Sequence, residues 1–133
     1  MLALATSLAD FPLSDDFPLQ AAARSPACGS TLRIGLTRDP DGSIARVGLS
    51  TQACAIGQAA AALFVRSAAG KNAGDIDAAL NDVERWLSGE GELPGWPGFA
   101  VLSAARDYPG RHGAILLAWR AARDALSSEP LDG

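Results

Sequence analysis

The chain has 133 residues, of which 48% are hydrophobic and 20% are charged, and its formal net charge at pH 7 is −4. This length suits one domain built around one hydrophobic core. The balanced composition excludes a disordered or fibrous chain, and the negative charge argues against a nucleic-acid partner, which normally requires a basic surface.

The sequence gives no sign of membrane insertion or secretion. No apolar run is long enough to cross a bilayer, and the start MLALATSLADFPL lacks the basic residues that open a signal peptide. Two cysteines are too few for a secreted disulfide framework. We therefore expect a cytoplasmic protein without membrane contact, in which a cysteine fills the core, binds a metal or reacts.

Residues 1–24 carry no regular pattern. The motif DFPL occurs there twice, at Asp10–Leu13 and Asp16–Leu19, but a spacing this short does not indicate a repeat architecture. We expect a short helix followed by an irregular arm that lies on the core; a partner-binding peptide is the alternative. The expected organisation is an arm (1–24), a single domain (25–128) and a tail (129–133).

Residues 31–50 predict an antiparallel hairpin. The segments 31–37 and 44–50 both alternate apolar and polar residues, and the turn sequence RDPDGS separates them. Alternation of this kind places one face of each strand in the core. The residues expected on that face are Leu32, Ile34, Leu36, Ala45, Val47 and Leu49.

After the hairpin the apolar spacing becomes helical. One helix is expected to begin at Ala55 or Ile56 and to stop at Gly70. A second is expected from Asp75 to Gly89, a short one over 99–106 and a last one over 113–127. Strands that come first and helices that follow imply an α+β fold, in which the helices pack on one face of a small antiparallel sheet.

Three positions at the ends of these elements are candidates for chemistry. Cys28 lies in SPACGS, Cys54 in TQACAIG and His112 in YPGRHGAILLAW. The N-terminus of a helix favours an anion, so a thiolate at Cys54 would be stabilised there. Gly29 would let a metal, a sulfide or a partner's tail approach Cys28 closely. Buried or loop cysteines without a chemical role are the alternatives.

The histidine is a weaker signal. His112 could supply an imidazole ligand, and the preceding Arg111 could stabilise a thiolate or a persulfide. Most single histidines are surface or helix-capping residues, and this is the alternative. The two cysteines form no Cys-x-x-Cys pair, and a Cys–His nucleophile is formally possible, although nothing else supports a hydrolase.

These motifs, in this order, resemble the NifU/IscU/SufU family of iron–sulfur cluster scaffold proteins, and most closely its SufU-like branch. SPACGS resembles the family's Pro-x-Cys-Gly-Asp stretch before a strand, and TQACAIGQAAAAL resembles its second cysteine, which leads into a helix of small residues. GKNAGDIDAAL resembles the family's Gly-Lys before an acidic helix start. In YPGRHGAILLAWRAA, Arg111 matches the arginine before the family's third cysteine.

The chain departs from the family at two ligand positions. Ser30 stands where the family has an aspartate, and Ala114 stands where it has the third cysteine, while His112 is off register. A [2Fe–2S] cluster or a structural zinc takes four protein ligands. The resemblance supplies Cys28 and Cys54, and Ser30, His112, a small thiol, a partner protein or a second copy in a homodimer would complete the set. Alternatively, the site holds neither a cluster nor zinc.

Three functional hypotheses follow. The resemblance implies a carrier rather than an enzyme, in which Cys28 and Cys54 accept sulfur from a cysteine desulfurase or ligate iron or zinc, and a cluster passes to acceptor proteins. The second is a degenerate module that binds the desulfurase but holds no cluster. The third is a thiol–disulfide pair, which needs the two cysteine Cα atoms within about 7 Å.

Overall fold

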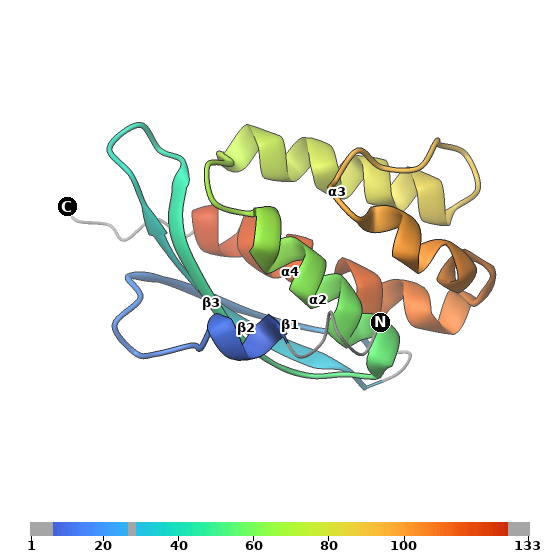
Figure 1. Cartoon of the computed structure of the whole chain (residues 1–133), viewed down its shortest axis with the longest axis horizontal. Helices are drawn as coiled ribbons and strands as arrows, with labels where there is room; N and C mark the ends of the chain where they lie inside the picture. The colour runs from blue at the N-terminus through green and yellow to red at the C-terminus, as the bar shows by residue number, and fades with distance from the viewer. Residues whose placement is uncertain (1–6, 27–28, 128–133) are drawn as a thin grey trace.

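The computed structural model describes residues 7–26 and 29–127 and forms a three-stranded antiparallel sheet with helices on one face (Figure 1). The strands β1 (Leu19–Arg24), β2 (Thr31–Arg38) and β3 (Ile44–Gln52) lie side by side in the order β1-β2-β3. The expected α+β class is therefore confirmed.

The predicted hairpin is formed by β2 and β3. Ile34 pairs with Leu49 and Leu36 with Val47, and all four side chains are buried. Alternation in the sequence fixes which face each strand buries, because a slip of one residue would turn the apolar side chains to solvent. Ala45 is only half-buried, near the turn.

The irregular arm expected over 1–24 is wrong for Leu19–Arg24, which forms β1 and pairs with β2 from Leu19↔Leu36 to Arg24↔Thr31. The segment reads LQAAAR and has no β-branched or aromatic residue, so its intrinsic strand signal is weak, and pairing with β2 decides its structure. The expected short helix is confirmed as the 3-10 turn η1 (Ser7–Asp10). The division into arm, domain and tail stays a prediction.

The segment between η1 and β1 packs against the sheet, as expected of the arm. Phe17 is buried and lies over two glycines, Gly35 of β2 and Gly48 of β3, which are register partners. A Cβ on Gly35 would lie 2.5 Å from Phe17 Cγ, so only glycine admits the ring here. Pro12 adds an isolated bridge to Leu49.

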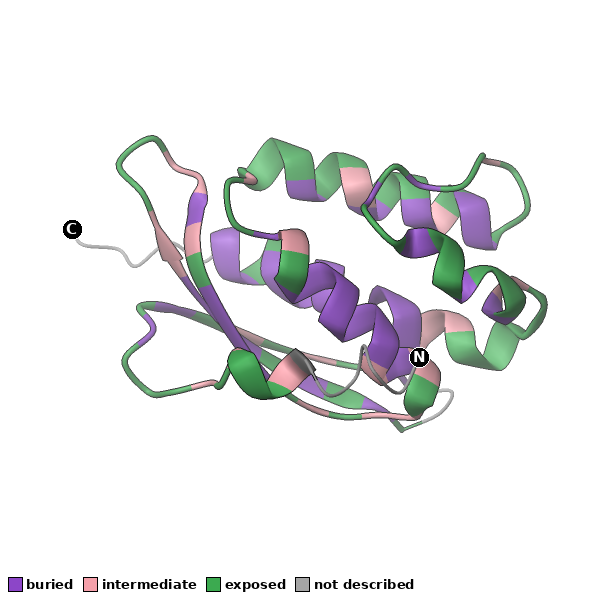
Figure 2. Ribbon diagram, viewed as in Figure 1, coloured by how far each residue is buried: buried purple, intermediate pink, exposed green. Residues whose placement is uncertain are grey.

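The three α-helices are α2 (Ala55–Ser67), α3 (Ala73–Leu87) and α4 (His112–Ser127); α2 and α4 contact the sheet, and α3 packs against α4. The central helix is α4, which contacts β1, β2, α2 and α3. Buried residues follow the facing sides of the helices and the sheet (Figure 2). The 3-10 helices η2 (Phe99–Asp107) and η3 (Pro109–Arg111) connect α3 to α4. His112, expected before the last helix, is its first residue.

The second predicted helix begins earlier than expected, at Ala73. Asn72 accepts a hydrogen bond from the Asp75 N–H at 2.9 Å, and the Asp75 carboxylate accepts one from the Asn72 N–H at 3.0 Å. This reciprocal capping box satisfies two backbone donors that would otherwise lack partners. It therefore lets the helix begin at Ala73, two residues before the predicted start.

An aromatic cluster holds the helices together. Phe64 stacks on Trp96 at 5.4 Å between ring centroids, and both rings meet Trp119 edge to face. Trp86 and Phe99 extend the cluster. Such pairs add to the stabilisation from burial itself, and the Trp96 Nε1–H is fixed by donation to the Leu63 carbonyl at 2.8 Å.

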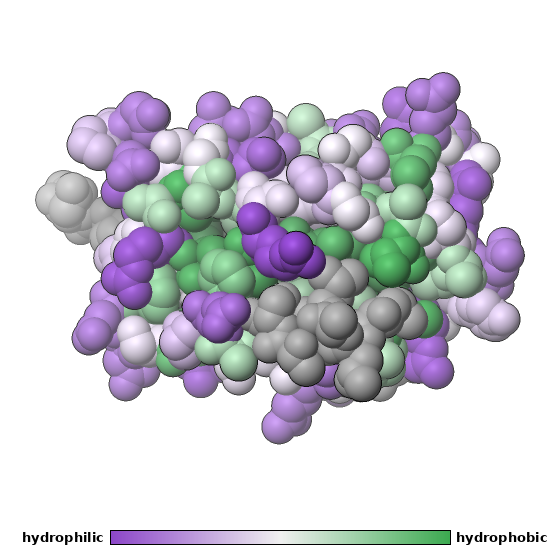
Figure 3. All heavy atoms as spheres, in the orientation of Figure 1, coloured by the Kyte–Doolittle hydropathy of each residue, from purple (hydrophilic) through white to green (hydrophobic). Residues whose placement is uncertain are grey.

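No helix within the described ranges is long and apolar enough to cross a membrane. On the face shown in Figure 3, hydrophobic surface forms an interrupted band between hydrophilic margins. The larger apolar side chains that remain exposed are Leu93, Val101 and Tyr108.

Candidate functional site

The three chemical motifs converge at one end of the sheet. Thr31, which opens β2, pairs with Gln52, which closes β3, and the Thr51 hydroxyl donates to the Thr31 carbonyl at 2.7 Å. Cys54 follows two residues after Gln52 and leads into α2. The antiparallel register therefore places Thr31, which follows the SPACGS motif, beside Gln52 of the TQACAIG motif.

Cys54 is the N-cap residue of α2. Its backbone is extended (φ −66°, ψ 171°), its carbonyl accepts the Gln58 N–H at 2.9 Å, and its side chain is half-buried. Within the described ranges, Cys54 forms no disulfide and its side chain makes no cap hydrogen bond. The first N–H groups of a helix have no intrahelical acceptor, so a thiolate or another anion at this position meets unsatisfied donors.

Cys28 lies outside the described residues, but the segment around it is anchored on both sides. The Ser25 N–H donates to the Ser30 carbonyl at 2.8 Å, and the Gly29 N–H donates to the Ser25 carbonyl at 2.8 Å. Gly29 has a φ of +72°, a conformation that favours glycine. Ser25 and Ser30 are both buried. Backbone hydrogen bonds thus link Ser25, which follows β1, to Gly29 and Ser30, which precede β2.

The first turn of α4 contacts both cysteine-bearing segments. A Cβ built on Gly113 would lie 3.1 Å from the Cβ of Ser25 and closer still to its hydroxyl. A Cβ built on Gly57, in the first turn of α2, would lie 3.1 Å from the Cβ of Ala114. Ser25, Gly57 and Gly113 were not identified from the sequence as part of the site. The only feature that could have indicated them is that each is a small residue near Cys28, Cys54 or His112 in the sequence.

Ala114, at the position of the family's third cysteine, is buried at 2% exposure. It faces α2 rather than open solvent, close to the Cys54 junction. A methyl group there supplies no ligand, so the described part of the site offers fewer donors than the family pattern.

His112 and Arg111 stand beside this turn. The His112 Nε2–H donates to the Arg106 carbonyl at 2.8 Å, which requires the hydrogen to be on Nε2 because a carbonyl only accepts. In the neutral ring, Nδ1 then keeps its lone pair. Arg111 is exposed, and among the described residues it makes no ion pair.

The described residues do not form a metal site by themselves. Across 7–26 and 29–127, no group of three or more His, Cys, Asp or Glu side chains could hold a metal ion. The predicted roles of Cys28, Cys54, Ser30, His112 and Arg111 stay predictions.

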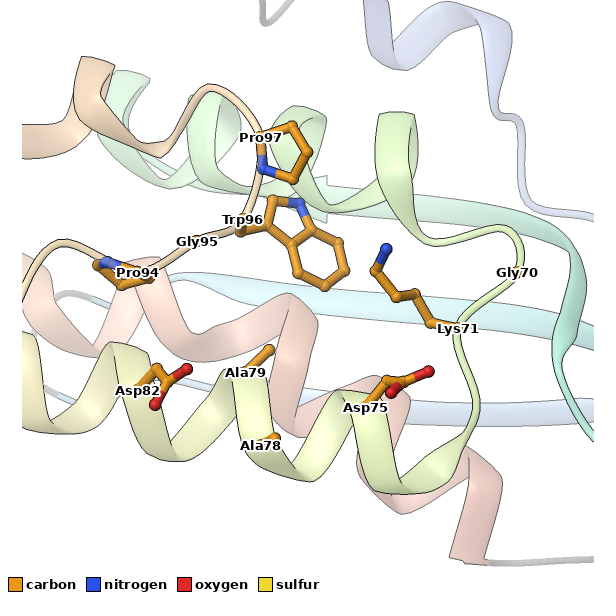
Figure 4. A pocket seen from close by; sticks show the side chains of 10 residues that line it. All are labelled: Gly70, Lys71, Asp75, Ala78, Ala79, Asp82, Pro94, Gly95, Trp96 and Pro97. Carbon is orange, nitrogen blue, oxygen red and sulfur yellow. The ribbon is translucent and has the colours of Figure 1, made fainter.

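The largest cavity among those described lies elsewhere, with a volume of about 350 Å³. Figure 4 shows it between α3, the connection after α2 and the loop around Trp96. The Lys71 Nζ lies 5.3 Å from the Trp96 ring centroid there. Lys71 follows the C-terminal end of α2, and Cys54 caps the N-terminal end about 20 Å away along a 13-residue helix. This cavity is therefore separate from the cysteine end.

Comparisons with known proteins give consistent results. No family model matches the chain. The chain is 25% identical over 113 residues to the iron–sulfur cluster assembly scaffold protein IscU of Thermotoga maritima, covering 84% of this chain and 79% of that protein.

Two solved structures resemble the fold closely. A nitrogen-fixing NifU-like protein (N-terminal) from Brucella abortus has a TM-score of 0.79 and 27% identity, covering 93% of this chain and 89% of that one. A putative scaffold protein for the SUF system from Fervidobacterium islandicum AW-1 has a TM-score of 0.77, with 90% and 93% covered. At 20% identity, the second likeness shows the fold alone.

Proposed function

We propose that the chain is an iron–sulfur cluster assembly scaffold of the NifU/IscU/SufU-like family, and that it carries sulfur, iron or both on Cys28 and Cys54. A cysteine desulfurase would deliver the sulfur, and acceptor proteins would take the assembled cluster. Both partners and the sulfur-transfer role belong to the proposal, as does action in the cytoplasm, where thiols stay reduced.

One observation supports this proposal above the others, namely the meeting of three motifs at one end of the molecule. Thr31 pairs with Gln52, Ser25 lies against Gly113, and Gly57 lies against Ala114. Segments distant in the sequence thus approach each other near Cys54 and Ala114, and this supports the proposal.

Sulfur transfer needs no outside oxidant at this site. The Cys54 thiolate would attack the terminal sulfur of a persulfide on the desulfurase, forming a new S–S bond as the donor's S–S bond breaks. The electron pair of the broken bond leaves with the donor thiolate, and the product is a persulfide on Cys54. The α2 N-terminus would stabilise the anion before and after this step, and the exposed Arg111 lies one residue before α4 to add positive charge.

Two thiolates supply half of the ligands that a [2Fe–2S] cluster or a structural zinc takes. His112 Nδ1 and Ser30 are the candidates within the chain. A small thiol, a partner or a second copy in a homodimer could supply the rest. These routes differ in stoichiometry, so the ratio of metal to protein chains separates them.

Anaerobic reconstitution with iron, a cysteine desulfurase and cysteine tests the proposal. We expect visible charge-transfer absorbance in the wild type and its loss in Cys28→Ala and in Cys54→Ala. Mass spectrometry of each cysteine peptide reports persulfide independently of cluster formation. No colour together with no persulfide on either cysteine would overturn the proposal.

The buried methyl of Ala114 favours a second candidate, a module that binds a desulfurase without holding a cluster. In that case the double variant Cys28→Ala/Cys54→Ala still binds the desulfurase and still supports function in cells. A null phenotype for a folded double variant rejects this second candidate.

A further inference from the structure

The sheet differs in charge from the rest of the chain. Its three strands contain four arginines and no aspartate or glutamate, so all 15 acidic residues lie outside the strands. The chain as a whole nevertheless has a net charge of −4. The α-helices lie on one side of the sheet (Figure 1), and we call the opposite side the outer face. The positive charge of the strands is therefore placed on a part of the molecule that the α-helices can leave open.

Three of the four arginines project from the outer face. Arg24, Arg33 and Arg46 are exposed, and the residues on either side of each are buried or half-buried. Because successive side chains of a strand point to opposite faces, the three guanidinium groups lie on the face turned away from the core. None of the three forms an ion pair with another described residue. The fourth, Arg38, instead donates to the Leu126 carbonyl of α4.

The strand register sets the length of this positive surface. Arg24 lies opposite Thr31 and Arg46 lies opposite Thr37, while Arg33 is between these two threonines on β2. The threonines are six residues apart, so the arginines extend over about 20 Å along the strands, at roughly 3.3 Å per residue. A single small anion cannot reach across this distance, whereas an extended peptide of about six residues does so.

The rest of the outer face is uncharged. Phe17 covers its two glycines, and the Arg46 Cζ lies 5.2 Å from the Phe17 ring centroid. The other outward-facing strand residues are Gln20, Ala22, Thr31, Thr37, Ser50 and Gln52. The acidic residues nearest to the strands in the sequence belong to turns at the end of the sheet far from Arg24, namely Asp15, Asp16, Asp39 and Asp41. The surface near Arg24 and Arg33 is thus basic and polar.

We propose that the outer face of the sheet binds an extended acidic segment of a partner protein, whose carboxylates meet Arg24, Arg33 and Arg46. A guanidinium group binds a carboxylate through two parallel N–H donors, and a positive patch speeds the encounter with an anionic partner. The net negative charge disfavours a nucleic acid. A lipid surface is disfavoured because the exposed large apolar side chains, Leu93, Val101 and Tyr108, lie outside the sheet.

Fluorescence anisotropy on the full-length chain tests this inference. The probe is a labelled peptide of about eight residues that alternates glutamate and serine, so that its carboxylates share one side when it is extended. We expect binding that weakens as salt rises from about 50 mM to about 300 mM, because exposed charges are screened. The same peptide with glutamine in place of glutamate should not bind.

Substitutions locate the binding surface. We expect Arg24→Gln/Arg33→Gln to raise the Kd about tenfold and Arg46→Gln to raise it severalfold. The matched control is Arg66→Gln/Arg85→Gln, which removes two exposed arginines from α2 and α3 and should change the Kd less than about twofold. Circular dichroism and urea unfolding establish that each variant is folded.

A charge exchange separates recognition from a general effect on the sheet. Arg24→Glu/Arg33→Glu should lose the glutamate peptide and gain binding of the same peptide with lysine in place of glutamate. A loss of folding would abolish binding of both peptides. A folded exchange variant that failed to bind the lysine peptide would count against the proposal.

Several results would overturn the inference. The first is an affinity that is unchanged in Arg24→Gln/Arg33→Gln or in Arg46→Gln. The second is displacement of the peptide by an equal concentration of inorganic phosphate, which would show that a small anion suffices. The third is arginine-dependent binding of an RNA oligonucleotide or of phosphatidylserine vesicles without binding of the peptide. The fourth is a dimer of the wild type, lost in Arg24→Gln/Arg33→Gln, that excludes the peptide, since the occupant would then be a second copy.

The inference goes beyond the proposed function and does not depend on it, because none of these arginines carries sulfur or metal. Cys54→Ala should bind the peptide as the wild type does. A wild type that binds the peptide but takes up neither sulfur nor iron rejects the proposed function alone. A wild type that takes up sulfur but does not bind the peptide rejects this inference alone.

Discussion

Helices α2 and α3 begin in opposite ways. At α3, the side chains of the N-cap Asn72 and of the third helical residue Asp75 each accept a hydrogen bond from the other residue's backbone N–H. At α2, the N-cap is Cys54, whose side chain makes no cap hydrogen bond among the described residues, and the third helical position is Gly57. The same structural problem is solved by side chains in one helix and left open in the other.

The two helix starts differ in what their first backbone N–H groups do: at α3 they stabilise the helix, and at α2 they remain available to bind an anion. A capping box stabilises its helix because it occupies the orphan N–H groups. An N-terminus without one keeps those groups for a group that arrives later, such as a thiolate bearing sulfur. The third position shows the constraint, since Ala53 and Ala114 leave no room at Gly57 for an acidic side chain.

The largest expected effect comes from giving α2 the start that α3 has. Cys54→Asn places a good N-cap side chain on an extended backbone, and we expect the free energy of unfolding to rise by about 1 kcal/mol. Sulfur loading at position 54 should be abolished, because no thiol remains. Urea unfolding and peptide mass spectrometry measure the two quantities.

Cys54→Ala is the control for that substitution. It removes the thiol without adding a cap, so sulfur loading is lost while stability stays near that of the wild type. If Cys54→Asn were no more stable than Cys54→Ala, the N-terminus of α2 would not be open to a capping group.

The second effect concerns the crowding at Gly57. Gly57→Ala gains helix propensity of up to about 1 kcal/mol but forces a methyl to within 2.8 Å of Ala53 and 3.1 Å of Ala114. Overpacking typically costs about 1 to 3 kcal/mol, so we expect a net loss of about 1 kcal/mol in unfolding free energy.

Gly74→Ala in the first turn of α3 is the partner measurement. Its nearest neighbour would be the Asn72 side-chain oxygen at 3.3 Å, and the residue is exposed. We expect a smaller change there. A stabilised Gly57→Ala protein would show that α2 and α4 can separate at this point without loss.

The third effect is the loss of the closed cap itself. Asn72→Ala removes an acceptor of the Asp75 N–H, and we expect unfolding free energy to fall by about 1 kcal/mol. Sulfur loading on the cysteines should be unchanged, because Asn72 lies at the far end of α2 from Cys54. A variant that lost sulfur loading while remaining folded would link the two ends of the molecule.

The sequence carried enough information for most of the fold. Alternation in β2 and in β3 from Val47 onward, and helical spacing in α3 and α4, correspond to the faces that the structure buries, whereas near the turn Ile44 is buried and Ala45 is not. Leu19–Arg24 was missed because its alanines fit a helix, a strand or a loop, and only pairing with β2 decides between them. Local preferences are weak where side chains are small.

The candidate site was predictable only in part. The cysteine motifs could be recognised because they are short and local. The contacts of Gly113 with Ser25 and of Gly57 with Ala114 were not predictable, since they depend on how α4 crosses the sheet and α2. A glycine required by a distant neighbour looks the same in a sequence as a glycine in a loop.

The smallest expected effect lies in the turn between β2 and β3, which uses side-chain closure as α3 does. Asp41 accepts from the Ser43 hydroxyl at 2.6 Å and from the Ser43 N–H at 3.0 Å, and these hydrogen bonds lower the pKa of its carboxyl group. Because the folded pKa lies below the unfolded one, the resulting stabilisation is present at neutral pH. It is lost as the pH falls through the acid range below about pH 4.

The stability difference between wild type and Asp41→Asn should therefore shrink on acidification. Asp77→Asn, an exposed substitution on α3 that removes the same charge, controls for net charge. Urea unfolding between pH 7 and pH 3 measures both, and a wild-type advantage over Asp41→Asn that did not shrink over this range would show that the Asp41 carboxylate does not contribute through this pair of hydrogen bonds.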